Sequence, residues 1–127
     1  MFLGIDLTTK EQKPTACAIL DEHGGLDSVT KLSTDDDMVA LAEAHSPPII
    51  AIDSPLGFPE GMDCLEEDHD CQSIHSFKGR VGERQLIAEG IGLYVTTKRS
   101  IIKPMIYRAI ELAKRFEVLG FQVIEVY

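Results

Sequence analysis

The chain has 127 residues, of which 44% are hydrophobic and 26% are charged. This size and composition predict one globular domain with a hydrophobic core, and they exclude a disordered tail, a collagen-like fibre and a disulfide-rich miniprotein. The net charge of −9 argues against a simple non-specific nucleic-acid binder, although residues 78–115 carry nine basic residues and only three acids and therefore favour a local basic surface.

The sequence has no features of a secreted or membrane-spanning protein. No segment approaches the roughly 20 apolar residues that cross a bilayer, and the N-terminus lacks the basic and apolar regions of a secretory signal. Three cysteines are an odd number, which favours reduced thiols over a disulfide framework. We therefore expect a cytoplasmic protein without a membrane partner.

Hydrophobic periodicity and turn residues predict a regular order of elements along the chain. Strands are predicted at residues 2–7, 14–20, 26–32, 49–53 and 121–126. Helices are predicted from a cap at Ser33 or Thr34 to the Pro47-Pro48 pair, at residues 82–88, and at residues 101–119 with Pro104 in the first turn. Hairpins followed by strands that helices connect indicate an α/β fold with a mixed sheet. We treat residues 1–127 as one domain with an irregular insert at about 54–81.

Acidic residues stand at the ends of three predicted strands. Asp6 closes the first, Asp53 closes the fourth, and Glu125 lies near the end of the last. If these strands are parallel neighbours, their carboxylates lie along one sheet edge and repel one another unless a cation binds. Oxygen ligands of this kind suit Mg²⁺ or Mn²⁺, which support phosphodiester hydrolysis. The alternative is that these acids are ordinary turn or cap residues.

The insert contains four zinc-type ligands within 12 residues. Cys64, His69, Cys71 and His75 have the spacing C-x4-H-x-C-x3-H, which differs from a standard zinc finger. The alternatives are an acidic loop with incidental Cys and His residues, or a disulfide between Cys64 and Cys71 in an oxidising compartment. Cys17 falls in a strand and is expected in the core.

Basic residues precede the longest predicted helix. Lys98, Arg99 and Lys103 lie near its first turn, where backbone N–H groups and cations together can hold a phosphate. Arg80 and Arg84 can serve in the same way, whereas the alternative is a solvated start of the helix. The eight aromatic residues do not alternate with the bases, so no stacking platform for single strands is predicted.

Five segments in this order resemble a known family. They are Gly4–Asp6 (GID), Ala51–Gly57 (AIDSPLG), Gly82–Arg84 (GER), Thr97–Pro104 (TKRSIIKP) and Val123–Tyr127 (VIEVY). Together they resemble an uncharacterised family of predicted nucleases (domain of unknown function 429) that is placed among ribonuclease-H-like folds. The resemblance covers nearly the whole chain.

The resemblance implies a five-stranded mixed sheet in the order 3-2-1-4-5 and a metal-dependent nuclease, a hydrolase whose substrate is DNA or RNA. Asp6 and Asp53 match the first two acids of the family, and Glu83 or Glu125 would be additional ligands. Family members continue through a further helix beyond the equivalent of Tyr127, and related nucleases carry another metal-binding acid there. Because this chain stops at the fifth strand, we expect a missing final helix, an uncovered sheet face and homo-oligomers.

Two other functions remain open on the sequence. Residues 4–9 (GIDLTT) resemble the first phosphate loop of actin-like kinases, which predicts nucleotide binding, although that fold needs two such domains to close on ATP. A catalytically inactive interaction module that has lost its last acid is the other alternative.

Overall fold

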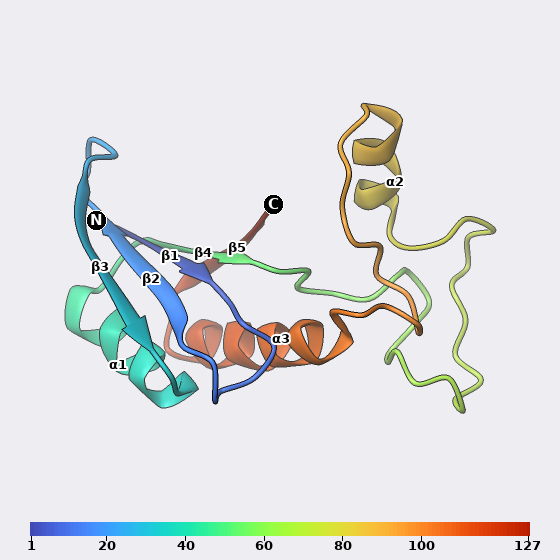
Figure 1. The fold of residues 1–127 in the computed structure, drawn as a ribbon, viewed down its shortest axis with the longest axis horizontal. Coiled ribbons are helices and arrows are strands. Elements are labelled where there is room, and N and C mark those ends of the chain that lie inside the picture. Colours follow the sequence, from blue (N-terminus) through green and yellow to red (C-terminus); the bar gives the residue numbers. More distant parts are fainter.

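A mixed β-sheet with the predicted strand order forms the centre of the computed structural model, which describes residues 1–127 (Figure 1). The strands are β1 (Phe2–Asp6), β2 (Thr15–Leu20), β3 (Leu26–Leu32), β4 (Ile49–Asp53) and β5 (Gln122–Val126). The helices are α1 (Asp35–His45), α2 (Val81–Ala88) and α3 (Lys103–Val118). The sheet order is β3-β2-β1-β4-β5, with β1, β4 and β5 parallel and β2 antiparallel to both neighbours. The expected α/β class and sheet order are therefore confirmed.

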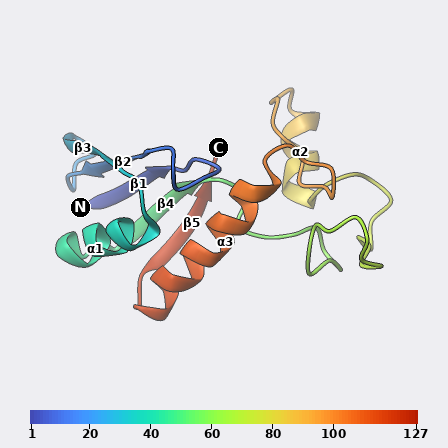
Figure 2. The same cartoon turned by 60° about the horizontal axis from the view of Figure 1, so that its bottom comes forward.

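Buried and partly exposed side chains alternate along the parallel strands, so the sheet has one buried face and one open face. Leu3 pairs with Ile50 and Ile5 pairs with Ile52, and all four side chains are buried on the same face of the sheet. Helices α1 and α3 both cover this face (Figure 2). The opposite face carries Ala18 and Ala51 in its centre and no packed helix, and its side chains stay partly exposed.

Local signals explain where the two packed helices begin and end. Thr34 caps α1 by accepting a hydrogen bond from the backbone N–H of Asp37 (3.1 Å), and Ser46 ends the helix in a left-handed conformation just before the two prolines. Helix α3 has Pro104 in its first turn and buries a continuous stripe of side chains. That stripe is Ile106, Ala109, Leu112, Ala113 and Phe116.

The insert after β4 runs without a helix or strand until α2 begins at Val81. It extends away from the sheet together with α2 (Figure 1). Leu65 is its completely buried side chain, and the hydroxyl of Tyr107 on α3 accepts a hydrogen bond from the backbone N–H of Leu65 (2.7 Å). None of the three helices is long and apolar enough to cross a membrane.

Candidate functional site

Asp6 and Asp53 occupy equivalent positions at the ends of neighbouring parallel strands. The register pairs Ile5 with Ile52, so the next residue on each strand is the aspartate, and both side chains project from the open face. Neighbouring strands lie about 4.8 Å apart. Desolvation, and then the negative charge of Asp6, raise the pKa of Asp53 above its ordinary value. The structure therefore brings together the two acids for which the sequence predicted a cation.

A small cavity begins at Asp53. It has a volume of about 200 Å³ and is lined by Asp53 and Ser54, by the segment around Tyr94, by Met105 of α3 and by Tyr127. More than half of its lining residues are hydrophobic, and Asp53 is the one charged residue among them. This arrangement gives a ligand that binds at the two aspartates an adjacent surface for an apolar or planar group.

Glu125 does not join the two aspartates. It pairs in register with Ile52, so its side chain projects from the opposite face to that of Asp53. There it accepts hydrogen bonds from both terminal nitrogens of Arg80 (2.7 and 2.5 Å) and from the backbone N–H of Leu56 (2.9 Å). Burial would raise the pKa of Glu125, but Arg80, Tyr127 and the Leu56 N–H outweigh it and hold the pKa below its ordinary value.

Glu83 is held in the same polar network and is completely buried. It accepts hydrogen bonds from the backbone N–H (2.8 Å) and hydroxyl (2.7 Å) of Thr96, and from the backbone N–H of Arg80 (3.2 Å). Gly79 takes a left-handed conformation (φ 82°) beside it, where an added Cβ would lie 2.8 Å from Oε1 of Glu83. Arg80 thus joins the start of α2 to β5. In the sequence, the glutamate three residues after Arg80 is the feature that indicates a helix start there.

The basic residues proposed to hold phosphate lie in three separate parts of the structure. Lys98 and Arg99 line a hollow of about 320 Å³ with Thr97 and Lys78, a lysine that sequence reasoning did not select. Lys103 is instead the first residue of α3 and is not part of that hollow. Arg84 lies on α2, with its guanidinium 6.0 Å from the centre of the Phe77 ring. The hollow is therefore the one place where two of the predicted cations lie together. No acid lines it, although Glu67 pairs with Arg99 (3.6 Å) and Lys98 donates to the backbone carbonyl of His69.

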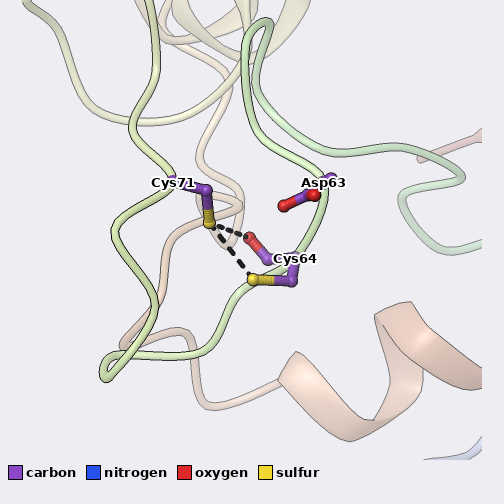
Figure 3. A group of neighbouring side chains, drawn as sticks. All are labelled: Asp63, Cys64 and Cys71. Carbon is purple, nitrogen blue, oxygen red and sulfur yellow. Dashed lines mark hydrogen bonds between the residues drawn. The ribbon is translucent and has the colours of Figure 1, made fainter.

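Three of the four zinc-type ligands of the insert lie close together. The sulfur of Cys64 lies 3.1 Å from the sulfur of Cys71 and 3.1 Å from Nδ1 of His69. Figure 3 shows the two sulfur atoms facing each other with the carboxylate of Asp63 nearby, and the ligand atoms of Asp63, Cys64 and Cys71 all lie within 4.8 Å of one another. His75 does not join them.

His75 binds elsewhere in the insert: its Nε2 lies 2.9 Å from a carboxylate oxygen of Glu60, and its ring stacks on Phe77 at 4.8 Å between centres. Asp63 takes the remaining place beside the two sulfurs, although it was not selected from the sequence. The one sequence feature that could have indicated Asp63 as a ligand is its position directly before Cys64.

The turn that follows β1 is held by hydrogen bonds within the turn and by Arg108 of α3. The hydroxyl of Thr8 donates to the carbonyl of Lys13 (2.7 Å), and the guanidinium of Arg108 donates to the carbonyl of Thr8 (2.8 Å). The hydroxyl that the phosphate-loop resemblance would assign to a nucleotide therefore binds within the turn.

Comparisons of the chain with models of protein families, with curated proteins and with solved structures gave no match.

Proposed function

We propose that this protein is a metal-dependent phosphodiesterase with a ribonuclease-H-like fold, and that nucleic acid is its substrate. The observation that carries the proposal is the pairing of Asp6 and Asp53 at adjacent ends of β1 and β4, on one face of the sheet. Open α/β sheets bind ligands at the carboxyl ends of their strands.

The donor set fits a hard divalent cation. Desolvation raises the pKa of Asp53, and the negative charge of Asp6 on the neighbouring strand raises it further. A cation between the two carboxylates would remove their repulsion. Mg²⁺ and Mn²⁺ prefer oxygen ligands of this kind. When bound, such an ion polarises a phosphoryl group and lowers the pKa of a water ligand.

The chain's other residues have supporting roles in this proposal. Lys78, Lys98 and Arg99 form the cationic hollow and hold phosphates of the substrate backbone without reading its sequence. Glu125 and Arg80 are positioning residues, because the Glu125 carboxylate fixes the backbone N–H of Leu56, three residues after Asp53.

The test is cleavage of fluorescently labelled DNA and RNA, single- and double-stranded, in the presence of Mn²⁺ or Mg²⁺. We expect wild-type cleavage that a chelator abolishes, and activities lowered more than ~100-fold in Asp6→Asn and Asp53→Asn because each removes a metal ligand. Asp27→Asn is the matched control, since Asp27 is an exposed strand carboxylate away from this edge. Equal cleavage by Asp6→Asn and wild type would contradict the proposal, and absence of Mn²⁺ binding would favour an inactive interaction module.

A further inference from the structure

We infer that the insert holds a structural Zn²⁺ ion between the thiolates of Cys64 and Cys71, with Asp63 and His69 as the further ligands. This site is separate from the strand-end aspartates and does not depend on the proposed phosphodiesterase activity.

The positions of the donor atoms carry the inference. Two thiolates that share one tetrahedral zinc, with Zn–S bonds of ~2.3 Å, lie roughly 3.8 Å apart. Here the two sulfurs lie 3.1 Å apart, so the fold has already brought together two residues that are seven positions apart. The sulfurs must separate by roughly 0.7 Å to share one tetrahedral ion. A carboxylate oxygen of Asp63 lies within 4.8 Å of both sulfurs. Nδ1 of His69 lies 3.1 Å from the Cys64 sulfur but not within 4.8 Å of all three of these ligand atoms, so its ring must move toward the ion to become the fourth ligand.

The surroundings of the thiols favour a cation. Five acids lie between or beside the two cysteines: Asp63, Glu66, Glu67, Asp68 and Asp70. Lys98 donates to the backbone carbonyl of His69 and Arg99 pairs with Glu67 (3.6 Å), so these two cations offset only part of the negative charge of the stretch. Ionising two neighbouring thiols in such surroundings is unfavourable without a cation. Zinc supplies two positive charges and accepts the mixed sulfur, nitrogen and oxygen donors that this segment offers.

The insert also has little else to order it. Between residues 60 and 80 its backbone makes few hydrogen bonds, such as His69 N–H to the Glu66 carbonyl (3.3 Å) and Ile74 N–H to the Glu60 carbonyl (2.9 Å). Leu65 is buried directly after Cys64, and Tyr107 holds its backbone N–H, so one end of the proposed site is fixed to α3. A metal that joins Cys64 to Cys71 would also fix the part of the insert around Cys71 to α3.

The binding test uses the full chain under reducing conditions, stripped of metal with a chelator and titrated with Co²⁺ and then Zn²⁺. We expect one equivalent of Co²⁺ to give a thiolate-to-metal charge-transfer band and tetrahedral visible bands, which Zn²⁺ then displaces. Cys64→Ser and Cys71→Ser should each weaken binding by more than ~100-fold, and His69→Ala and Asp63→Asn by about 10-fold or more.

Two matched variants control for composition and folding. Cys17→Ala removes a thiol that is buried in the core, and His75→Ala removes an imidazole that pairs with Glu60, so both should bind Co²⁺ as wild type does. Zn²⁺ should also slow protease cleavage within residues 60–78 in wild type and in Asp6→Asn, which separates this site from the strand-end acids.

Three outcomes would overturn the inference: no charge-transfer band with reduced wild type, the same band in Cys64→Ser, or loss of the band in His75→Ala with the fold intact by circular dichroism. A reduced protein that binds no metal but readily forms a Cys64–Cys71 disulfide would show that the pair is a redox site instead.

Discussion

The carboxylate of Asp53 opposes the stability of the fold that presents it. Partial desolvation and the nearby charge of Asp6 raise its pKa, so the folded protein prefers the protonated form more than the unfolded chain does. The penalty for ionised Asp53 is absent below the ordinary pKa of 3.8 and is complete once the pH exceeds the raised pKa. Such a penalty is typical of residues kept for binding.

Replacing this carboxylate with its neutral isostere should therefore stabilise the protein. We expect Asp53→Asn to raise the melting temperature slightly near pH 7, since the Asp53 side chain is exposed and solvent screens its repulsion with Asp6. The gain should shrink toward zero as the pH falls below about 4. Thermal unfolding monitored by circular dichroism at both pH values measures this. Mn²⁺ should stabilise wild type more than the variant, and a variant that melts at or below the wild-type temperature at neutral pH would refute the argument.

The insert and α3 depend on each other through one tyrosine. Tyr107 accepts from the backbone N–H of Leu65 (2.7 Å) and donates to a carboxylate oxygen of Glu66 (2.9 Å), and its ring meets Phe58 edge-on at 5.7 Å between centres. Since Leu65 and Glu66 directly follow Cys64, the tyrosine positions the segment that carries the thiols. Helix α3 is thus both a wall of the core and the support of the irregular segment.

Removing only the hydroxyl of Tyr107 should loosen the insert while the core stays packed. We expect Tyr107→Phe to lower the free energy of unfolding by about 1–2 kcal/mol, because the Leu65 N–H loses its partner, and to increase protease cleavage within residues 60–78 several-fold. Urea denaturation and limited proteolysis measure the two effects. Tyr94→Phe is the control, since Tyr94 is exposed and makes no such hydrogen bonds. Equal cleavage of Tyr107→Phe and wild type would show that the hydroxyl does not position the insert.

The regular elements could be predicted because their signals are local. Short apolar runs, an alternating segment at residues 26–32 and the turn residues between them located all five strands. Thr34 and the Pro47-Pro48 pair bounded α1, since each of these features acts within a few residues. The proximity of Asp6 and Asp53 could be predicted because each ends a strand, and parallel neighbouring strands end at the same edge of a sheet. The order itself came from the family resemblance.

The remaining features depend on contacts between distant residues, which the sequence does not encode locally. Glu125 sits one residue out of phase with Asp53 across the β4–β5 pair, and only the register shows that its side chain projects from the other face. Its partner Arg80 lies 45 residues earlier in the chain, so no local pattern indicates the pair. In the insert, no periodic pattern indicated that Asp63, and not His75, lies beside the two cysteine sulfurs. The tertiary contacts of the loop decide which of the two residues does.

The packing of this fold is one-sided. Both α1 and α3 cover the face that buries Leu3, Ile5, Ile50 and Ile52, whereas the strand-end aspartates project from the open face (Figure 2). The hydrophobic core therefore fixes the strands from one side and leaves the carboxyl edge accessible to a ligand from the other. Contacts that join the helical layer to the sheet's loops add to the stability that this core supplies.

Arg108 is the side chain that joins these parts most directly. Its guanidinium on α3 donates from Nε to Asp35 at the start of α1 (2.8 Å) and from Nη1 to the carbonyl of Thr8 after β1 (2.8 Å). Only 9% of the Arg108 side chain and 19% of the Asp35 side chain are exposed. Three segments that are distant in sequence are thus held by one cation.

Breaking this contact should destabilise the entire domain rather than one segment. We expect Arg108→Met to lower the free energy of unfolding by about 3 kcal/mol, since it leaves the mostly buried Asp35 carboxylate and the Thr8 carbonyl without their donor. Adding Asp35→Asn should recover part of that loss, with a coupling of about 1–2 kcal/mol between the two positions in a double-mutant cycle. Urea denaturation of all four proteins measures the cycle, and Lys114→Met, which removes an exposed cation of α3, should change stability by less than about 0.5 kcal/mol. Strictly additive losses would show that Arg108 and Asp35 act independently.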